Sequence, residues 1–306
     1  MIKTKLKNLS LLTNPAEVKK IINSKKDLLG LTESVRDISV STLQSYQDQR
    51  SYNVTLIYKI TMENDIQKNI VASTSWPVSN EYGYFAGKMV SKSLGDSTPV
   101  KIPAYYTYIK KYNLILREYV SGERLSKKIS KNKDIGTSHV DSLMNWLAIF
   151  QKIKSNKKVA VAINLYNLEN NFKILRKQKP EEVKALDEEY EKIKPLIIEW
   201  SNKHNQTLVH GDLNPANIMI DNNELAVIDF ENVYRGDRVA DIANLSVYIT
   251  ILQEEVGADN VAETEKNLIS AYEKYSDKLN INELERFYVY KKYFILLFKS
   301  DVLVWK

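Results

Sequence analysis

Apolar and β-branched residues alternate with polar residues through the first 120 residues of the chain. Runs such as YNVTLIYKITM (52–62), QKNIVASTS (67–75) and NLILREYV (113–120) are separated by short polar stretches. This spacing predicts β-strands. One segment, NEYGYFAGKMVSKSL (80–94), has helical spacing instead. The first part of the chain is therefore expected to be a sheet with one helix on it.

After residue 120 the spacing of apolar residues becomes mainly helical. Segments 141–154, 170–178, 181–203 and 262–306 carry apolar residues three or four positions apart. Gly122 is the only glycine between Gly95 and Gly136, and it suits a short hinge. We predict an α+β chain of two lobes, a small β-rich N-terminal lobe (1–120) and a larger, mainly helical C-terminal lobe (121–306).

Composition narrows the classes of function. With 306 residues and 43% apolar content, the chain can bury a sizeable core. It has no cysteine, which removes disulfides and thiolate sites and fits a reducing cytosol, so a cytoplasmic location is expected. The N-terminal apolar run is too short for a signal peptide, and no apolar stretch approaches the ~20 residues that span a bilayer. The expectation is therefore that no membrane is involved. The net charge of +6 comes from scattered lysines, which argues against nucleic-acid binding.

One segment, HGDLNPANIMIDNNELAVIDF (210–230), concentrates Asp and Asn residues around two apolar runs. The apolar runs predict a hairpin, with GDLNPA as the loop that leads into it. The hairpin would bring Asp229 back beside Asp212 and Asn217. One amide oxygen and one carboxylate, completed by phosphate oxygens, suit Mg2+ on a nucleotide. A further carboxylate can accept the proton of a hydroxyl, so the segment predicts phosphoryl transfer to an alcohol.

Local turn chemistry is the plainer explanation of these residues, because Asp and Asn favour turns and helix caps. It does not account for their order, their spacing and the intervening apolar strands together. The functional interpretation is therefore preferred for Asp212, Asn217 and Asp229.

The segments HGDLNPANIM, VIDFE and GDRVADIANL resemble the aminoglycoside phosphotransferase and choline kinase family, small-molecule kinases with the protein-kinase-like fold. The resemblance implies that Asp212 is the catalytic base and that Asn217 and Asp229 are the magnesium ligands. It also implies that His210 is a structural hydrogen-bonding residue. Asp241 would brace the loop, although a role at the start of the following helix is an alternative.

Weaker support for the resemblance comes from LILREYVSGERL (114–125). The resemblance implies that the backbone of Glu118 and Val120 faces adenine. It also implies that the loop between strands near STLQSYQDQRSYN (41–53) covers the phosphates.

The chain departs from the kinase pattern at one position. Kinases of this fold place a lysine on the third strand, where it pairs with a helix carboxylate and holds nucleotide phosphates. Here that position falls at Ala72 or Ser73. Three explanations are open: Lys59 replaces the missing lysine, the strand that carries Lys59 is itself the third strand, or the site has lost transfer activity. Glu81 is the helix carboxylate to test as a partner of Lys59, which is otherwise a surface lysine.

The spacing from Asp229 to Asp241 leaves no room for the activation segment on which protein kinases dock peptides. A small hydroxyl compound is therefore the expected acceptor, bound by helices within 125–205 and 245–306. Glu231 could meet a cationic acceptor or hydrogen-bond the next turn.

These features predict a Mg2+-dependent kinase. It would transfer the γ-phosphoryl group of ATP or GTP to a small metabolite or an aminoglycoside-like or choline-like acceptor. The alternative is a catalytically silent, kinase-like nucleotide-binding protein that acts through a partner. Nucleotidyl transfer is a third possibility. The motifs specify neither the acceptor, nor the choice between ATP and GTP, nor a protein partner, oligomeric state or pathway.

Overall fold

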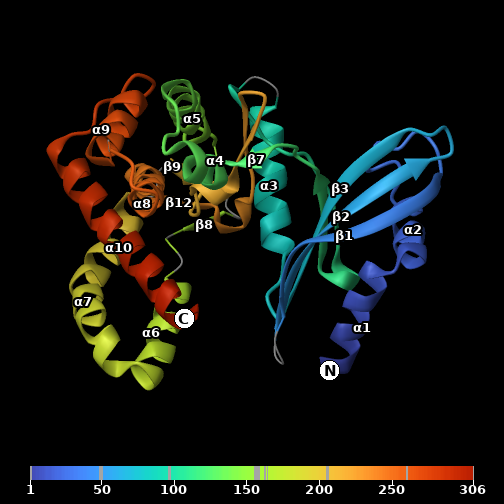
Figure 1. Ribbon diagram of the computed structural model, residues 1–306, viewed down its shortest axis with the longest axis horizontal. Coiled ribbons are helices and arrows are strands. Elements are labelled where there is room, and N and C mark those ends of the chain that lie inside the picture. Colours follow the sequence, from blue (N-terminus) through green and yellow to red (C-terminus); the bar gives the residue numbers. More distant parts are fainter. Residues whose placement is uncertain are drawn as a thin grey trace. The chain divides into compact units, whose positions relative to one another are not determined.

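The computed structural model describes residues 2–47, 51–95, 98–154, 159–161, 163, 165–204, 207–259 and 261–305. The chain divides into two compact units (Figure 1). Unit 1 comprises residues 1–93 and 102–120, and unit 2 comprises residues 94–101 and 121–306. Unit 1 is rich in strands and unit 2 is mainly helical, which confirms the predicted α+β class.

A five-stranded antiparallel sheet forms the centre of unit 1. Its strands, in spatial order, are β1 (Val35–Gln47), β2 (Tyr52–Met62), β3 (Gln67–Trp76), β6 (Leu114–Glu118) and β5 (Tyr105–Ile109). In β2 every second residue is buried, from Tyr52 to Met62. The strands that the alternating pattern predicted are confirmed.

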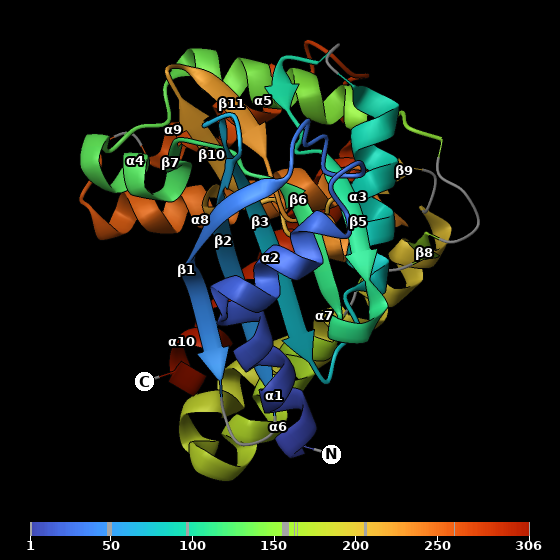
Figure 2. The ribbon, with the colours of Figure 1, turned by 90° about the vertical axis from the view of Figure 1, so that its right-hand side faces the viewer.

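Two N-terminal helices cover one face of this sheet, and the apolar pattern had not predicted them. They are α1 (Ile2–Thr13) and α2 (Pro15–Asn23), and both lie over the sheet in Figure 2. The Asn14 side chain caps α2 by accepting hydrogen bonds from the Ala16 and Glu17 amides. Apolar side chains of these helices pack in one core with alternate residues of β2, β3 and β6.

The predicted helix of unit 1 is α3 (Glu81–Leu94), which packs against β5. Gly87 permits this close approach, because a Cβ atom there would overlap the ring of Tyr105. One helical turn earlier, Tyr84 stacks on Tyr108 with ring centroids 6.1 Å apart. Ahead of α3, the Asn80 side chain donates to the Ser73 carbonyl. The helix is thereby anchored to β3 as well as to β5.

The most buried helix of unit 2 is α8 (Val239–Glu255). It is apolar on nearly every side, as expected for a helix surrounded by others. Its neighbours are α4 (Leu125–Asn132), α9 (Val261–Tyr272) and α10 (Ile281–Trp305). The other helices of unit 2 are α5 (Thr137–Phe150), α6 (Tyr166–Gln178) and α7 (Pro180–Lys203). Among the described helices, none is long and apolar enough to cross a membrane.

The predicted hairpin of unit 2 forms from β10 (Ile218–Asp221) and β11 (Glu224–Val227). Its turn residues Asn222 and Asn223 both have positive φ, which asparagine tolerates. The pair is flanked by β4 (Val100–Lys101) and β7 (Glu123–Arg124), and a separate sheet contains β8 (Ala160–Val161), β12 (Tyr234–Gly236) and β9 (Thr207–Val209).

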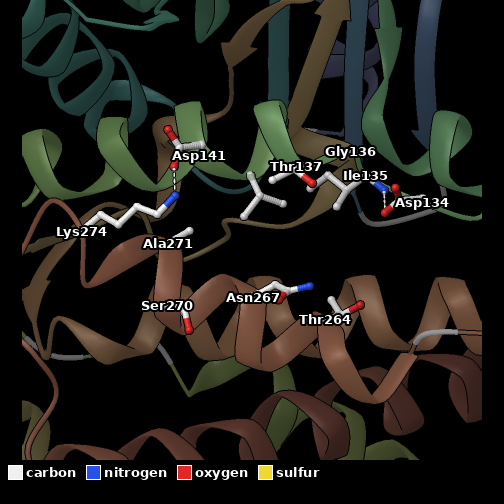
Figure 3. A pocket seen from close by; sticks show the side chains of 11 residues that line it. Asp134, Ile135, Gly136, Thr137, Asp141, Thr264, Asn267, Ser270, Ala271 and Lys274 are labelled. Atoms are coloured by element: carbon white, nitrogen blue, oxygen red, sulfur yellow. Dashed lines mark hydrogen bonds and ion pairs between the residues drawn. The ribbon is translucent and has the colours of Figure 1, made fainter.

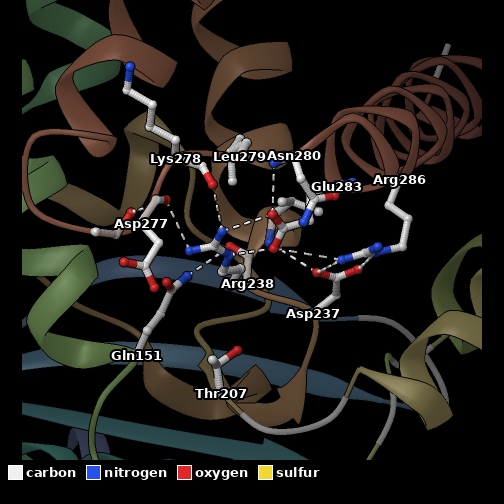
Figure 4. Close-up of polar contacts among 12 residues, drawn as sticks. Gln151, Thr207, Asp237, Arg238, Asp277, Lys278, Leu279, Asn280, Glu283 and Arg286 are labelled. Carbon is white, nitrogen blue, oxygen red and sulfur yellow. Dashed lines mark hydrogen bonds and ion pairs between the residues drawn. The ribbon is translucent and has the colours of Figure 1, made fainter.

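A buried ionic network joins the start of α8 to the start of α10 (Figure 4). The Arg238 guanidinium donates to both carboxylate oxygens of Glu283, with N–O distances of 2.7 and 2.9 Å. Arg286 donates to the carboxylate of Asp237, which is only 2% exposed. These two charge pairs fix the segment from which α8 begins.

Removing Arg286 should destabilise the fold strongly, because Asp237 would keep a buried charge without its cation. We expect Arg286→Met to lower the free energy of unfolding by about 3–5 kcal/mol in urea denaturation. The double variant Asp237→Asn/Arg286→Met removes both charges and should lose less. Equal losses in the single and double variants would show that the buried charge is not the cause.

Candidate active site

The loop that follows β9 carries His210 and Asp212 and is hydrogen-bonded to Asp241 of α8. The Asp241 carboxylate accepts the backbone N–H of His210 at 2.7 Å and that of Gly211 at 3.0 Å. Gly211 has φ +79°, and a side chain there would overlap the Asn232 carbonyl. Asp241 lies in the first turn of α8, yet its carboxylate accepts hydrogen bonds from this loop and none from the described residues at the helix N-terminus.

Two amide side chains hold the carboxylate of Asp212. Asn214 Nδ2 donates to Asp212 Oδ1 at 2.7 Å, and Asn217 Nδ2 donates to Asp212 Oδ2 at 2.9 Å. Asn217 Nδ2 also donates to the Asp212 carbonyl, at 3.0 Å. These bonds orient Asn217 so that its Oδ1 accepts no hydrogen bond from any described residue. The carboxylate of Asp212 therefore has a fixed position, and a free amide oxygen lies beside it.

Asp229 returns to the loop at the end of the hairpin. It adopts the left-handed conformation, with φ 69° and ψ 68°. The preceding residue, Ile228, donates its backbone amide to the Asn217 carbonyl at 3.0 Å. Burial, followed by the negative charge of Asp229, raises the pKa of Asp212 to about 7, against the hydrogen bonds from Asn214 and Asn217. The two carboxylates are therefore close enough to repel each other.

The donors at this place fit a magnesium ion. Asn217 Oδ1 and the Asp229 carboxylate are hard oxygen ligands. No group of three or more His, Asp or Glu side chains suited to a metal occurs among the described residues. A Mg2+ ion would therefore take most of its ligands from phosphates and water, as it does at nucleotide sites. The positive ion would also offset the repulsion between Asp229 and Asp212.

His210 is fully buried and contributes structure to the loop. Its Nε2 lies 3.1 Å from the Ile228 carbonyl, which requires a hydrogen on that nitrogen. Its ring packs on Phe230, with centroids 4.8 Å apart. Phe230 in turn contacts Phe150 of α5. This stack ties the loop and the hairpin to the helical core. Burial lowers the pKa of His210 to about 4.

The residues that the sequence predicted for the nucleotide lie in unit 1. Glu118 ends β6, where its amide donates to the Ala104 carbonyl at 2.8 Å and its carboxylate accepts the Ala104 amide at 3.0 Å. Val120 is the last residue of unit 1 and is half-buried. Lys59 is exposed on β2, and no hydrogen bond or ion pair joins it to Glu81 in the described part of the chain.

The segment QKNIVASTS forms β3, as predicted for the third strand, so Ala72 and Ser73 stand where the lysine was expected. The alternative that LIYKIT is the third strand is excluded, because this segment belongs to β2. The loop predicted to cover the phosphates, between strands near 41–53, falls between β1 and β2. Its residues 48–50 lie outside the described residues.

Sequence reasoning missed a group of side chains near Asp212. Tyr248 of α8 and Asp301 of α10 are close to one another, and burial together with Asp212 and Asp301 raises the pKa of Tyr248. Asn171 donates to Asp301 Oδ1 at 2.6 Å. Tyr248 lies seven residues after Asp241, hence on the same side of α8, and that spacing was readable. Asp301 carries no local signal, because only tertiary packing brings α10 to α8.

A cavity of about 230 Å³ lies elsewhere in unit 2, between α5 and α9 (Figure 3). Its charged groups already have partners. Lys274 pairs with Asp141 at 2.7 Å, and Tyr275 donates to the same carboxylate. None of the predicted catalytic residues lines this cavity, so it does not contribute to the candidate site.

Comparison with known proteins places the chain in a family and a fold. Residues 92–276 match the model of the phosphotransferase enzyme family. No curated protein sequence matches the chain.

Three solved structures resemble most of the chain. An ethanolamine kinase from Plasmodium vivax is 16% identical with a TM-score of 0.62, over 93% of this chain and 80% of that one. A choline/ethanolamine kinase family protein from Mesorhizobium loti is 14% identical with a TM-score of 0.61, over 94% and 85%. Amicoumacin kinase, solved with AMP-PNP, Ca2+ and Ami, is 14% identical with a TM-score of 0.59, over 84% and 79%. These likenesses confirm the predicted protein-kinase-like fold.

Burial of neutral His210 should make stability fall in acid. The pKa is about 4 in the folded chain against 6.5 ordinarily, so between these values the unfolded chain binds more protons. The free energy of unfolding should therefore drop by about 3 kcal/mol through this group as the pH falls from 7 to 4. Urea denaturation between pH 7 and pH 4 should show that the free energy of unfolding falls by about 3 kcal/mol less in His210→Gln than in the wild type. Parallel curves for the two proteins would contradict the assignment.

Proposed function

The chain belongs to the phosphotransferase enzyme family, and we propose that it is a small-molecule kinase using ATP or GTP with Mg2+. The acceptor is a hydroxyl group. The observation that carries the proposal is the fixed carboxylate of Asp212 beside a free Asn217 oxygen and the Asp229 carboxylate. A proton acceptor and two metal ligands are the groups that phosphoryl transfer to an alcohol needs.

Each residue has one part in the reaction. Asp212 orients the acceptor hydroxyl and takes its proton as the oxygen bonds to the γ-phosphorus. The bond from that phosphorus to the β–γ bridging oxygen breaks, and the nucleoside diphosphate leaves. Asn217 and Asp229 would hold Mg2+, which neutralises charge on the phosphates. Asp241 keeps Asp212 in place through the backbone of His210 and Gly211. The backbone of Glu118 and Val120 is proposed to meet the nucleobase.

The surroundings of Asp212 support a cationic acceptor. Asp301 offers a half-buried negative charge close to Tyr248, and Phe298 packs edge-on against the Tyr248 ring with centroids 5.9 Å apart. A carboxylate next to aromatic faces attracts an ammonium group by charge and by cation–π interaction. We propose an amino alcohol or aminoglycoside whose ammonium group lies near Asp301 and whose hydroxyl lies at Asp212.

Ser73 at the lysine position favours one competing candidate, a nucleotide-binding protein without transfer activity. The ordered Asp212, Asn214 and Asn217 contacts oppose it, because a silent protein does not need a fixed base. Nucleotide binding without turnover of any hydroxyl acceptor would favour this candidate over the kinase.

The nucleotide site can be tested by ligand-induced stabilisation. Mg-ATP at ~100 times its dissociation constant should stabilise the wild-type fold by about 2.7 kcal/mol. Asp229→Ala should lose the Mg2+-dependent part of the rise in melting temperature. The matched variant Asp212→Asn should keep that rise but lose turnover by a factor of roughly 100 or more, since it lacks the proton acceptor. A wild-type protein that responds to neither ATP nor GTP would remove the proposal.

The acceptor class can be tested on Asp301, outside the phosphoryl-transfer residues. Asp301→Asn keeps an oxygen for Asn171 and removes only the charge. For amino alcohols such as choline or ethanolamine, KM should rise by about 10-fold to 100-fold with kcat nearly unchanged. A neutral polyol serves as the control and should show no such rise. Turnover of neutral alcohols alone would exclude the cationic acceptor.

A further inference from the structure

Unit 1 lacks a lysine on β3, yet the sheet face on which it would stand can be identified. Thr55 Oγ1 and Ser73 Oγ lie 3.4 Å apart, so these residues share one face. Ala72 belongs to the core on the opposite face, which α1 and α2 cover. A side chain that takes the lysine's part must therefore project from the face of Ser73.

Arg117 projects from that face beside Ser73. In the β3–β6 register Ser73 is opposite Ile115, and Val71 is opposite Arg117. Leu116, between them, lies in the core on the opposite face, so Ile115 and Arg117 share the face of Ser73. Arg117 is thus the diagonal neighbour of Ser73, about 7–8 Å away and within reach of a long side chain.

The Arg117 side chain is available for a ligand. It is half-buried, and its guanidinium makes no hydrogen bond or ion pair with any described residue. A guanidinium carries five N–H donors and stays charged, so a half-buried one without a partner favours an anion. Its planar donor fork matches the oxygens of a phosphate group.

Other cations of unit 1 are less suited. Lys59 is opposite Asn69, four residues along β2 from the pair of Thr55 and Ser73, or about 13 Å. Lys68 donates to the Leu29 carbonyl at 2.6 Å. Lys88 donates to the Tyr84 hydroxyl at 2.6 Å.

Resting on the proposed function, we infer that Arg117 holds the phosphate groups of the nucleotide in place of the missing β3 lysine. The cation would thus stand on β6 instead of on the neighbouring β3, on the same face of the sheet. A small serine at position 73 leaves room for the longer guanidinium. Arg117 is accordingly a nucleotide-binding residue that positions the phosphates and takes no proton.

The test compares ligands with and without phosphates. Dissociation constants for Mg-ATP and for adenosine are measured by calorimetry on wild type, Arg117→Met and the matched control Lys59→Met. Arg117→Met should weaken Mg-ATP by about 10-fold to 100-fold, the loss of a charge-assisted contact, and leave adenosine unchanged. Lys59→Met should change neither. Melting temperatures without ligand verify folding, and Arg117→Gln replaces the Met variant if that one does not fold.

Each result distinguishes the inference from the proposed function on which it rests. Equal Mg-ATP affinity in wild type and Arg117→Met would overturn the role of Arg117 and leave the kinase proposal standing. A loss shared by adenosine would also overturn it, by placing Arg117 at the base. A wild-type protein that binds no nucleotide would instead remove the proposed function itself.

Discussion

The carboxylate of Asp241 is the constraint on which the candidate site depends. It is 1% exposed and accepts two consecutive backbone amides, those of His210 and Gly211. Buried amides without partners would cost ~1–3 kcal/mol each, so the loop conformation and the carboxylate require one another. Because Asp241 lies on α8, the loop is placed by a helix that is itself packed on nearly every side and tied to α10 by ionic pairs.

The side chains of Asn214 and Asn217 orient the carboxylate of Asp212. The amides of Asn214 and Asn217 point their hydrogens at Asp212, which fixes a carboxylate that would otherwise rotate. The same bond turns the Asn217 oxygen away from Asp212, where a hard cation can use it. One asparagine thus orients both the proposed proton acceptor and the oxygen proposed as a metal ligand. A glutamine or an aspartate at position 217 would not keep both contacts.

Unit 1 has the five-stranded sheet without the lysine that was expected on β3. Its five strands keep the register in which β3 neighbours β6, and Ser73 stands where a lysine was expected. Neighbouring strands present side chains to the same face at short distances, so a cation on either strand can reach the same ligand. The proposed role of Arg117 follows from this redundancy. It also explains why the absence of one motif residue is weak evidence against activity.

The sequence predicted the strands of unit 1, most helices of unit 2 and the hairpin, because local periodicity records which side of an element is buried. It also predicted His210, Asp212, Asn217, Asp229 and Asp241 as site residues, because they lie within one short segment whose turns bring them together. The N-terminal helices, the position of Arg117 on the sheet face of Ser73 and the packing of Asp301 beside Tyr248 depend on the tertiary structure. Strand register and helix packing connect residues far apart in the chain, and no local pattern encodes those distances.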